Sequence, residues 1–312
     1  MKPLKNFFGL LKGAFNEFSQ DNAFKLSASL SYYTVFSMGP LLIIIISLSG
    51  LFLGRAAVEG KIYDQLNGLI GAKASLEVED IIRNIQQSQH SVAGAIIGFG
   101  VLLLGATGVF TEIQGSINYI WSIRTKPRKG WLKIIINRLL SFSLVVALSF
   151  LLMVSLTVNA LMDVLNDHMK RFFTSVTVDM FYIINIVLIL VIITGLFAVI
   201  FKVLPDARIR WKDACVGAFF TALLFLLGKA LIGIYLGKSK IGLTYGASTS
   251  IIIILTWVYY SSIILYFGAE FTKVYTMRHG GGITPNDSAV FIIKREAKEI
   301  PAEPQEASDG KG

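Results

Sequence analysis

The residues best placed to do chemistry are the few ionisable side chains that lie in or beside long apolar stretches. Glu112 and Glu270 each follow such a stretch, Arg138 precedes one, and Lys229 lies within one. An ionisable group near hydrocarbon is costly, so each of these residues needs a partner or a function. Glu112, Glu270 and Arg138 lie at the ends of their stretches that face the same side, and they predict a polar layer at one face of a membrane. Two interpretations stay open: ion pairs that fix helix ends, or a polar vestibule for an ion or a charged headgroup.

Lys229 differs from the other three in depth. It lies about 15 residues into the apolar stretch 214–236, which is roughly 22 Å from the inner end of a helix that rises 1.5 Å per residue. At that depth it cannot reach Glu270. Its long side chain either extends to the outer surface or faces the interior of the helix bundle. In the second case it would attract a lipid phosphate or another anionic substrate.

A further set of polar side chains follows the second apolar stretch. Gln114 and Asn118 are four residues apart, so both are expected on one helix face, with Trp121 next to them. The two amides suit hydrogen bonds to another helix, and Trp121 suits an anchor at the membrane–water interface. The sequence has no hydrolase, metalloprotease or nucleotide-binding motif, and its three His and one Cys are far apart. We therefore expect no catalytic, cofactor or metal site and no enzymatic activity.

Six apolar stretches must position these side chains. Each reaches the roughly 20 residues that an α-helix needs to cross a bilayer. The predicted spans are about 26–54, 91–111, 139–162, 180–201, 214–236 and 241–269. They predict an all-α, polytopic membrane protein with six transmembrane helices. Gly39 and Pro40 interrupt the first span, and a proline inside a helix predicts a kink there.

Composition and charge agree with this class of protein. Charged residues make up 16% of the chain, whereas soluble domains carry about 25%. Of the 29 Lys and Arg residues, 20 lie in segments 1–25, 112–138, 202–213 and 270–312, and 8 lie in the segments on the other side. The positive-inside rule therefore predicts that both termini are cytoplasmic. Topology and anionic lipid headgroups account for the net charge of +9, so we expect no nucleic-acid partner.

Amphipathic helices are expected outside the spans. Residues 1–21 are predicted to form an interfacial helix, with apolar side chains at helical spacing that comprise Leu4, Phe7, Phe8, Leu11, Phe15 and Phe18. The first outer loop, 55–90, carries two apolar stripes, which predict two short surface helices. The membrane domain is predicted over 22–275. Residues 276–312 are expected to be a polar cytoplasmic tail, largely disordered.

Three blocks of the sequence resemble the YihY/BrkB family of bacterial inner-membrane proteins. They run from Leu30 to Pro40, from Gln114 to Trp121, and from Leu204-Pro205-Asp206 through Trp211–Ala214 and Tyr245-Gly246-Ala247 to Gly268-Ala269-Glu270. Their order and spacing extend over about residues 20–275, and Tyr245 joins the candidate functional positions. Met38-Gly39 stands where the family usually has bulkier apolar residues. The resemblance implies six spans and an inner-membrane location, and it implies little about mechanism.

The sequence and the resemblance together suggest three functions to consider for this protein. The leading hypothesis is a protein that moves or exposes a lipid or another amphipathic solute in envelope maintenance. The alternative is a non-transporting scaffold that docks envelope partners or forms a homo-oligomer. Some members of the family were once labelled ribonuclease BN, but this sequence has neither a nuclease motif nor a segment long enough for a soluble active site.

Overall fold

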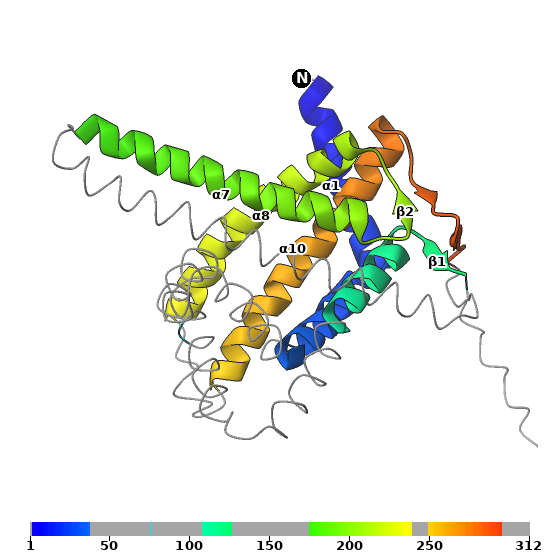
Figure 1. The fold of residues 1–312 in the computed structure, drawn as a ribbon, viewed down its shortest axis with the longest axis horizontal. Coiled ribbons are helices and arrows are strands. Elements are labelled where there is room, and N and C mark those ends of the chain that lie inside the picture. The colour runs from blue at the N-terminus through cyan, green and yellow to red at the C-terminus, as the bar shows by residue number, and fades with distance from the viewer. Residues whose placement is uncertain (1, 38–75, 77–107, 127–174, 239–248, 295–312) are drawn as a thin grey trace, which may run out of the picture.

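The computed structural model describes residues 2–37, 76, 108–126, 175–238 and 249–294. These residues are mostly helical (Figure 1). Several predictions fall outside the described residues and stay predictions. They concern the third span at 139–162, most of the first two spans, the kink at Gly39 and Pro40, the outer-loop helices in 55–90, Arg138 and Tyr245.

Three long helices dominate the described part of the chain: α7 (Ser175–Val203), α8 (Trp211–Lys238) and α10 (Thr249–His279). Each contains a segment long and apolar enough to cross a membrane, namely Ile186–Val203, Trp211–Ile232 and Ile252–His279. They coincide with the last three predicted spans. A helix that is apolar on all sides suits a lipid environment, because every backbone polar group is satisfied within the helix.

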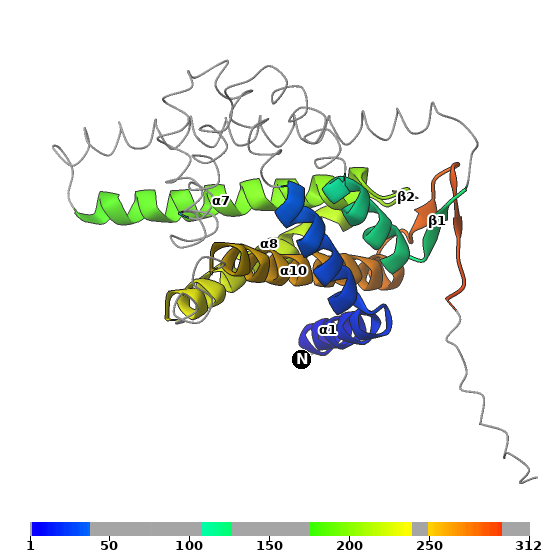
Figure 2. The same ribbon diagram turned by 90° about the horizontal axis from the view of Figure 1, so that it is seen from below.

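The helices are arranged with α8 in contact with both α7 and α10. Small residues allow the close contact between α8 and α10, since Gly217 and Gly268 each face a threonine of the other helix. Figure 2 shows α1 (Lys2–Gln20) and α7 on opposite sides of α8 and α10.

The N-terminal helix α1 packs against α10. Leu10 and Ala14 are buried with Phe271 and Val274 of α10. The predicted apolar stripe is therefore displaced, because Phe8 and Phe15 lie on the exposed side of the helix. Helix α1 ends at an elbow where Asn22 adopts a positive φ of 51°, a conformation that Asn tolerates better than most residues. The chain then continues as a second helix over residues 23–37.

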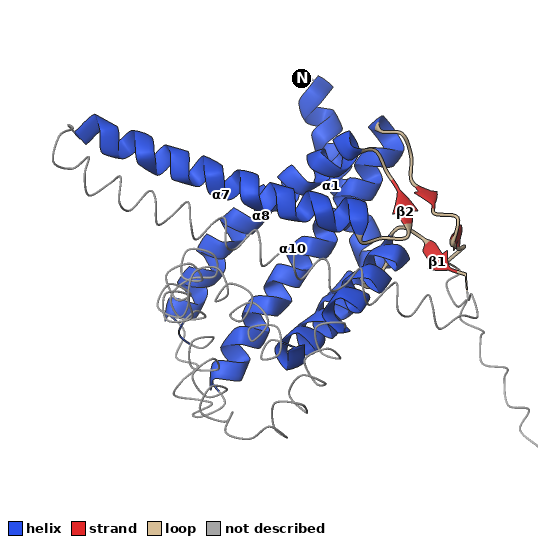
Figure 3. Ribbon diagram, viewed as in Figure 1, coloured by secondary structure: helices blue, strands red, loops and turns tan. Residues whose placement is uncertain are grey.

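In the described part of the chain, four short strands form a layer beyond one end of the helices (Figure 3). Strand β1 (Ile123–Thr125) pairs antiparallel with β4 (Ala289–Phe291), and Arg124 lies opposite Val290. Strand β2 (Ala207–Arg208) pairs antiparallel with β3 (Thr284–Pro285). The all-α prediction was therefore incomplete. Strands of two or three residues are too short to produce a periodic signal in the sequence.

The C-terminal prediction also requires correction. The sixth span was expected to end at Ala269 and a largely disordered tail to begin at residue 276, but α10 continues to His279 and β3 and β4 follow it. Further hydrogen bonds hold this segment in place besides the strand pairing. Gly281 N–H donates to Asp213 Oδ2 at 3.1 Å, and Asn286 N–H donates to the carbonyl oxygen of Asp206 at 2.9 Å.

Candidate functional site

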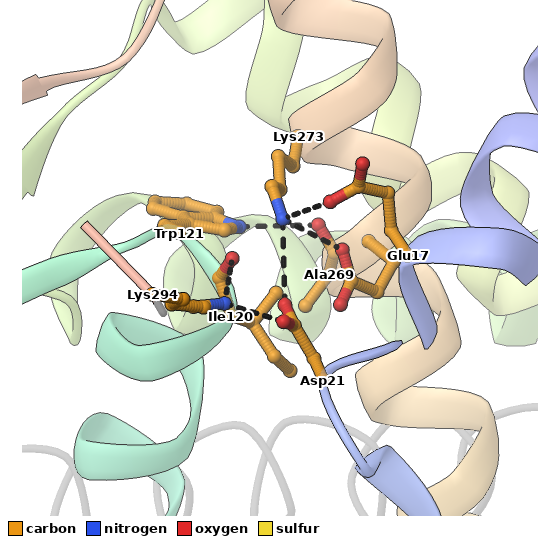
Figure 4. A network of polar contacts seen from close by, with 8 residues as sticks. Glu17, Asp21, Ile120, Trp121, Ala269, Lys273 and Lys294 are labelled. Atoms are coloured by element: carbon orange, nitrogen blue, oxygen red, sulfur yellow. Dashed lines mark hydrogen bonds and ion pairs between the residues drawn. The ribbon is translucent and has the colours of Figure 1, made fainter. Parts of the chain in front are cut away.

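A cluster of charged side chains lies between α1, α10 and the C-terminal segment (Figure 4). Lys273 is at its centre. The Nζ atom lies 2.6 Å from Glu17 Oε2, 3.4 Å from Asp21 Oδ2 and 3.4 Å from Glu270 Oε2. One ammonium group therefore contacts three carboxylates, which come from α1, from the elbow that follows α1 and from α10 itself.

Lys294 contributes a second ammonium group to this cluster. Its Nζ lies 2.6 Å from Asp21 Oδ1, 3.4 Å from the carbonyl oxygen of Ile120 and 4.4 Å from the centre of the Tyr119 ring. Burial lowers the pKa of Lys294, although Asp21 acts in the opposite direction. Lys294 follows β4, and the pairing of β4 with β1 places its side chain next to the elbow after α1.

Helical spacing explains why these residues meet. Glu17 and Asp21 continue the buried face of α1 that begins at Leu10 and Ala14, since residues three and four apart share a helix face. On α10, Glu270 and Lys273 are three residues apart and flank the apolar contact with α1. The contact that buries apolar side chains thus also brings the charges together.

Trp121 connects a third element, helix 108–120, to the cluster. Its buried indole Nε1–H donates to the carbonyl oxygen of Ala269 at 3.1 Å. The predicted interfacial anchor is therefore a buried crosslink between the end of helix 108–120 and α10. Ser122, with a positive φ of 57°, then turns the chain into β1.

Glu270 is the most enclosed member of the cluster. It is 0% exposed, and Oε1 has no hydrogen-bond partner within the described residues. Carboxylate oxygens of Glu17, Asp21 and Glu270 all lie within 4.8 Å of one another. Such spacing suits a cation, but the Lys273 ammonium already takes the central position. The donor set therefore does not fit a metal ion.

A second polar centre forms around Asp206, in the loop between α7 and β2. Its Oδ2 accepts hydrogen bonds from Gln114 Nε2 at 3.3 Å, Asn118 Nδ2 at 3.0 Å and Thr125 Oγ1 at 3.0 Å. Its backbone N–H donates to Asn118 Oδ1 at 2.8 Å. Gln114 and Asn118 thus meet, as one helix face predicts, but they hold a loop rather than another membrane helix.

The other predicted positions are more scattered. Glu112 is half-buried on helix 108–120 and interacts electrostatically with Tyr266, one turn of α10 from Glu270. Lys229 is half-buried on α8, next to Gly228, which faces Tyr260. Both Lys229 on α8 and Tyr260 on α10 are far from the charged cluster. The structure therefore joins Glu270 and Trp121 in one region, Gln114 and Asn118 in a second, and leaves Lys229 apart.

Sequence reasoning missed six residues whose side chains these two centres use for ion pairs or hydrogen bonds: Glu17, Asp21, Thr125, Asp206, Lys273 and Lys294. Helical spacing in the sequence could have identified two pairs of residues. Glu17 and Asp21 lie in register with the apolar face of α1, and Glu270 and Lys273 have the spacing of a helical ion pair. Lys294 gave no local signal, because its partner Asp21 is far away in the sequence.

The long apolar helices and the charges enclosed between them define a polytopic membrane protein. Comparison with known proteins names its family. The family described as "Virulence factor BrkB" matches residues 14–290, so the chain belongs to the BrkB family, whose curated members are called UPF0761 membrane proteins. The resemblance of the three sequence blocks is thereby confirmed.

Several curated relatives are similar over most of this chain. A UPF0761 membrane protein of Rhodospirillum centenum is 30% identical over 90% of the chain and 60% of its own length. Relatives from Saccharophagus degradans and Psychromonas ingrahamii are 25% and 26% identical over 98% and 81% of the chain. The match covers 69% of the first of these two relatives and 82% of the second. The chain therefore spans about 60% of the Rhodospirillum relative. No solved structure matches it.

Proposed function

We propose that this protein moves or exposes a lipid or another amphipathic solute at the bacterial inner membrane, in the maintenance of the cell envelope. One observation carries the proposal. Lys229 lies within a membrane-spanning helix, is half-buried, and has no ion-pair partner within the described residues. A cation at such a position is costly unless water, a polar group or an anion compensates it, and an anion from outside the protein would do so.

The depth of Lys229 favours a lipid phosphate as that anion. Lys229 is 18 residues beyond Trp211 along α8, which corresponds to about 27 Å at 1.5 Å per residue. It therefore lies near the end of the span opposite to the strand layer, within reach of headgroups in that leaflet. A lysine stem can lie along apolar surface while its ammonium group meets a phosphate.

The orientation is part of the proposal. The ion pair between Asp21 and Lys294 brings the N-terminal and C-terminal segments to the same side of the helices. By the positive-inside rule, the Lys and Arg residues in these segments support a cytoplasmic location for that side. In this arrangement the charged cluster is near the inner leaflet and Lys229 is near the outer one, while α1 presents Phe8 and Phe15 to the lipid interface.

The test is reconstitution of the full chain in vesicles that contain a fluorescently labelled anionic phospholipid. We expect faster transbilayer movement than in empty vesicles, a loss of at least half of that gain in Lys229→Met, and retention in Lys229→Arg. Lys212→Met, on the same helix but exposed at its other end, is the matched control. Movement no faster than in empty vesicles would refute the proposal.

A second candidate function, a docking scaffold, is favoured by the outer edge of the strand layer. Phe291 and Ile293 are 57% and 86% exposed, which is unusual for apolar side chains outside the membrane. Crosslinking in native membranes with a photoreactive residue at position 293 separates the two functions. A defined crosslinked partner, together with no lipid movement by the purified protein, would favour the scaffold.

A further inference from the structure

We infer that Asp21 and Glu270 share one exchangeable proton, so that the charged cluster is a proton-binding site. This inference is independent of the proposed lipid movement, because it rests on a different set of residues at the other end of the helices. The ligand is a hydronium-derived proton, held between two carboxyl groups of α1 and α10.

The proximity of the two carboxyl groups is the first observation. A carboxylate oxygen of Asp21 and one of Glu270 lie within 4.8 Å of each other. Two carboxylates are both acceptors, so a hydrogen bond between them requires a proton on one of them. Lys294 and Lys273 engage the two oxygens of Asp21, and Lys273 engages Oε2 of Glu270.

The unpartnered oxygen of Glu270 is the second observation. Its Oε1 is buried without a hydrogen-bond partner in the part of the chain that the structure describes, and the residue is fully buried. A carboxylate leaves such an oxygen with concentrated negative charge and no donor, whereas a neutral carboxylic acid carries far less charge there. This single orphan atom therefore indicates that Glu270 is held in its acid form.

The charge balance of the cluster also supports one bound proton. Glu17 and Asp21 face the centre from α1, Glu270 and Lys273 from α10, and Lys294 from the C-terminal segment. Helix 108–120 contributes only the carbonyl oxygen of Ile120 and the ring of Tyr119 to Lys294. Three carboxylates against two ammonium groups leave one negative charge in excess, and one bound proton removes it.

Neighbouring charges lie outside this set. Arg278 is two turns further along α10, where its guanidinium group lies against Gly9 and Gly13. Glu112 interacts with Tyr266 on the preceding turn of α10. Among the described residues Arg278 makes no ion pair with the cluster, so it does not supply the missing positive charge.

A path for exchange is present at the edge of the cluster. The side chain of Glu17 is 41% exposed and bonded to Lys273, which in turn contacts Glu270. A proton can therefore pass from water to Glu17 and along hydrogen-bonded groups to the buried pair. Lys294, whose side chain is 24% exposed, lies on the other side of the cluster.

The experiment is infrared difference spectroscopy of the full chain in lipid nanodiscs, titrated with pH in choline buffer. We expect a carbonyl band of a protonated carboxylic acid at neutral pH that disappears in Glu270→Gln and at alkaline pH. Glu112→Gln, which removes a half-buried carboxyl outside the cluster, should keep the band. Thermal unfolding of both variants verifies that they are folded.

Three outcomes would overturn the inference. The first is the absence of the band from the wild-type protein at neutral pH, which needs no variant. The second is an unchanged band in folded Glu270→Gln. The third is the complete loss of the band when Na⁺ replaces choline at constant pH, which would make the site a monovalent cation site. Failure of lipid movement leaves each of these readouts unaffected.

Discussion

Thr272 of α10 lies so close to Gly217 of α8 that a Cβ atom built at position 217 would be 1.9 Å from its Oγ1. The relationship is reciprocal, since a Cβ at Gly268 of α10 would be 2.0 Å from Oγ1 of Thr221. Each threonine donates to a glycine carbonyl of its own helix at 2.7 Å. Two Gly-x-x-x-Thr motifs thus interlock, and small residues allow the close approach.

Substitution of either glycine by alanine should weaken this contact. Both threonines are fully buried, so an added methyl group forces the helices apart, at a cost of about 1–3 kcal/mol. Gly195→Ala is the matched control, because nothing lies within 4 Å of a Cβ at that position of α7. Thermal unfolding in detergent measures the difference. Equal unfolding temperatures for Gly217→Ala and Gly195→Ala would show that the contact is not tight.

Removal of the central ammonium group should destabilise the charged cluster. Lys273→Met leaves three carboxylates without their common partner, and loss of one partner of a buried ion pair costs about 3–5 kcal/mol. The exposed part of Glu17 reduces this figure through solvent screening. The exposed Lys212→Met is the control for loss of a positive charge. A loss of stability no greater than that of the control would contradict a structural role for Lys273.

The Asp206 centre makes a separate prediction about the strand layer. Asp206→Ala removes the acceptor of three side-chain hydrogen bonds, and each buried donor left unsatisfied costs about 1–3 kcal/mol. Asp287→Ala is the control, since its ion pair with Arg208 is exposed on both sides and such pairs contribute at most about 1 kcal/mol. Limited proteolysis after residue 280 should accelerate in the first variant only. Equal rates would show that Asp206 does not hold the C-terminal segment.

Local signals explain which parts of the structure the sequence predicts. The apolar length of α7, α8 and α10 is a local property, and all three helices were predicted. The end of α10 was not predicted, because charged residues such as Glu270 and Lys273 usually mark the end of a membrane span. Here their ion pairs allow the helix to continue. For α1, spacing predicted a helix but not which of its two apolar faces packs against α10.

Long-range partners explain the rest of the site. Gln114 and Asn118 were found from their spacing on one helix, but their acceptor Asp206 lies 92 and 88 residues away. Lys294 was placed in a tail because its surroundings are polar and rich in charge. Its order depends on β1 and on Asp21, neither of which the local composition encodes.

The pH dependence of stability should report on Lys294. Burial lowers its pKa from the ordinary value of 10.5 in the folded protein, so the unfolded chain retains this proton when the folded chain has released it. Between the lowered pKa and 10.5 the unfolded state binds more protons, and stability therefore rises with pH. The difference in unfolding free energy between the wild type and Lys294→Met should shift in favour of the wild type as pH increases through this window. Lys12→Met, at an exposed position of α1, is the control for loss of a positive charge. A difference for Lys294→Met that falls with pH would mean that the ion pair with Asp21 outweighs burial.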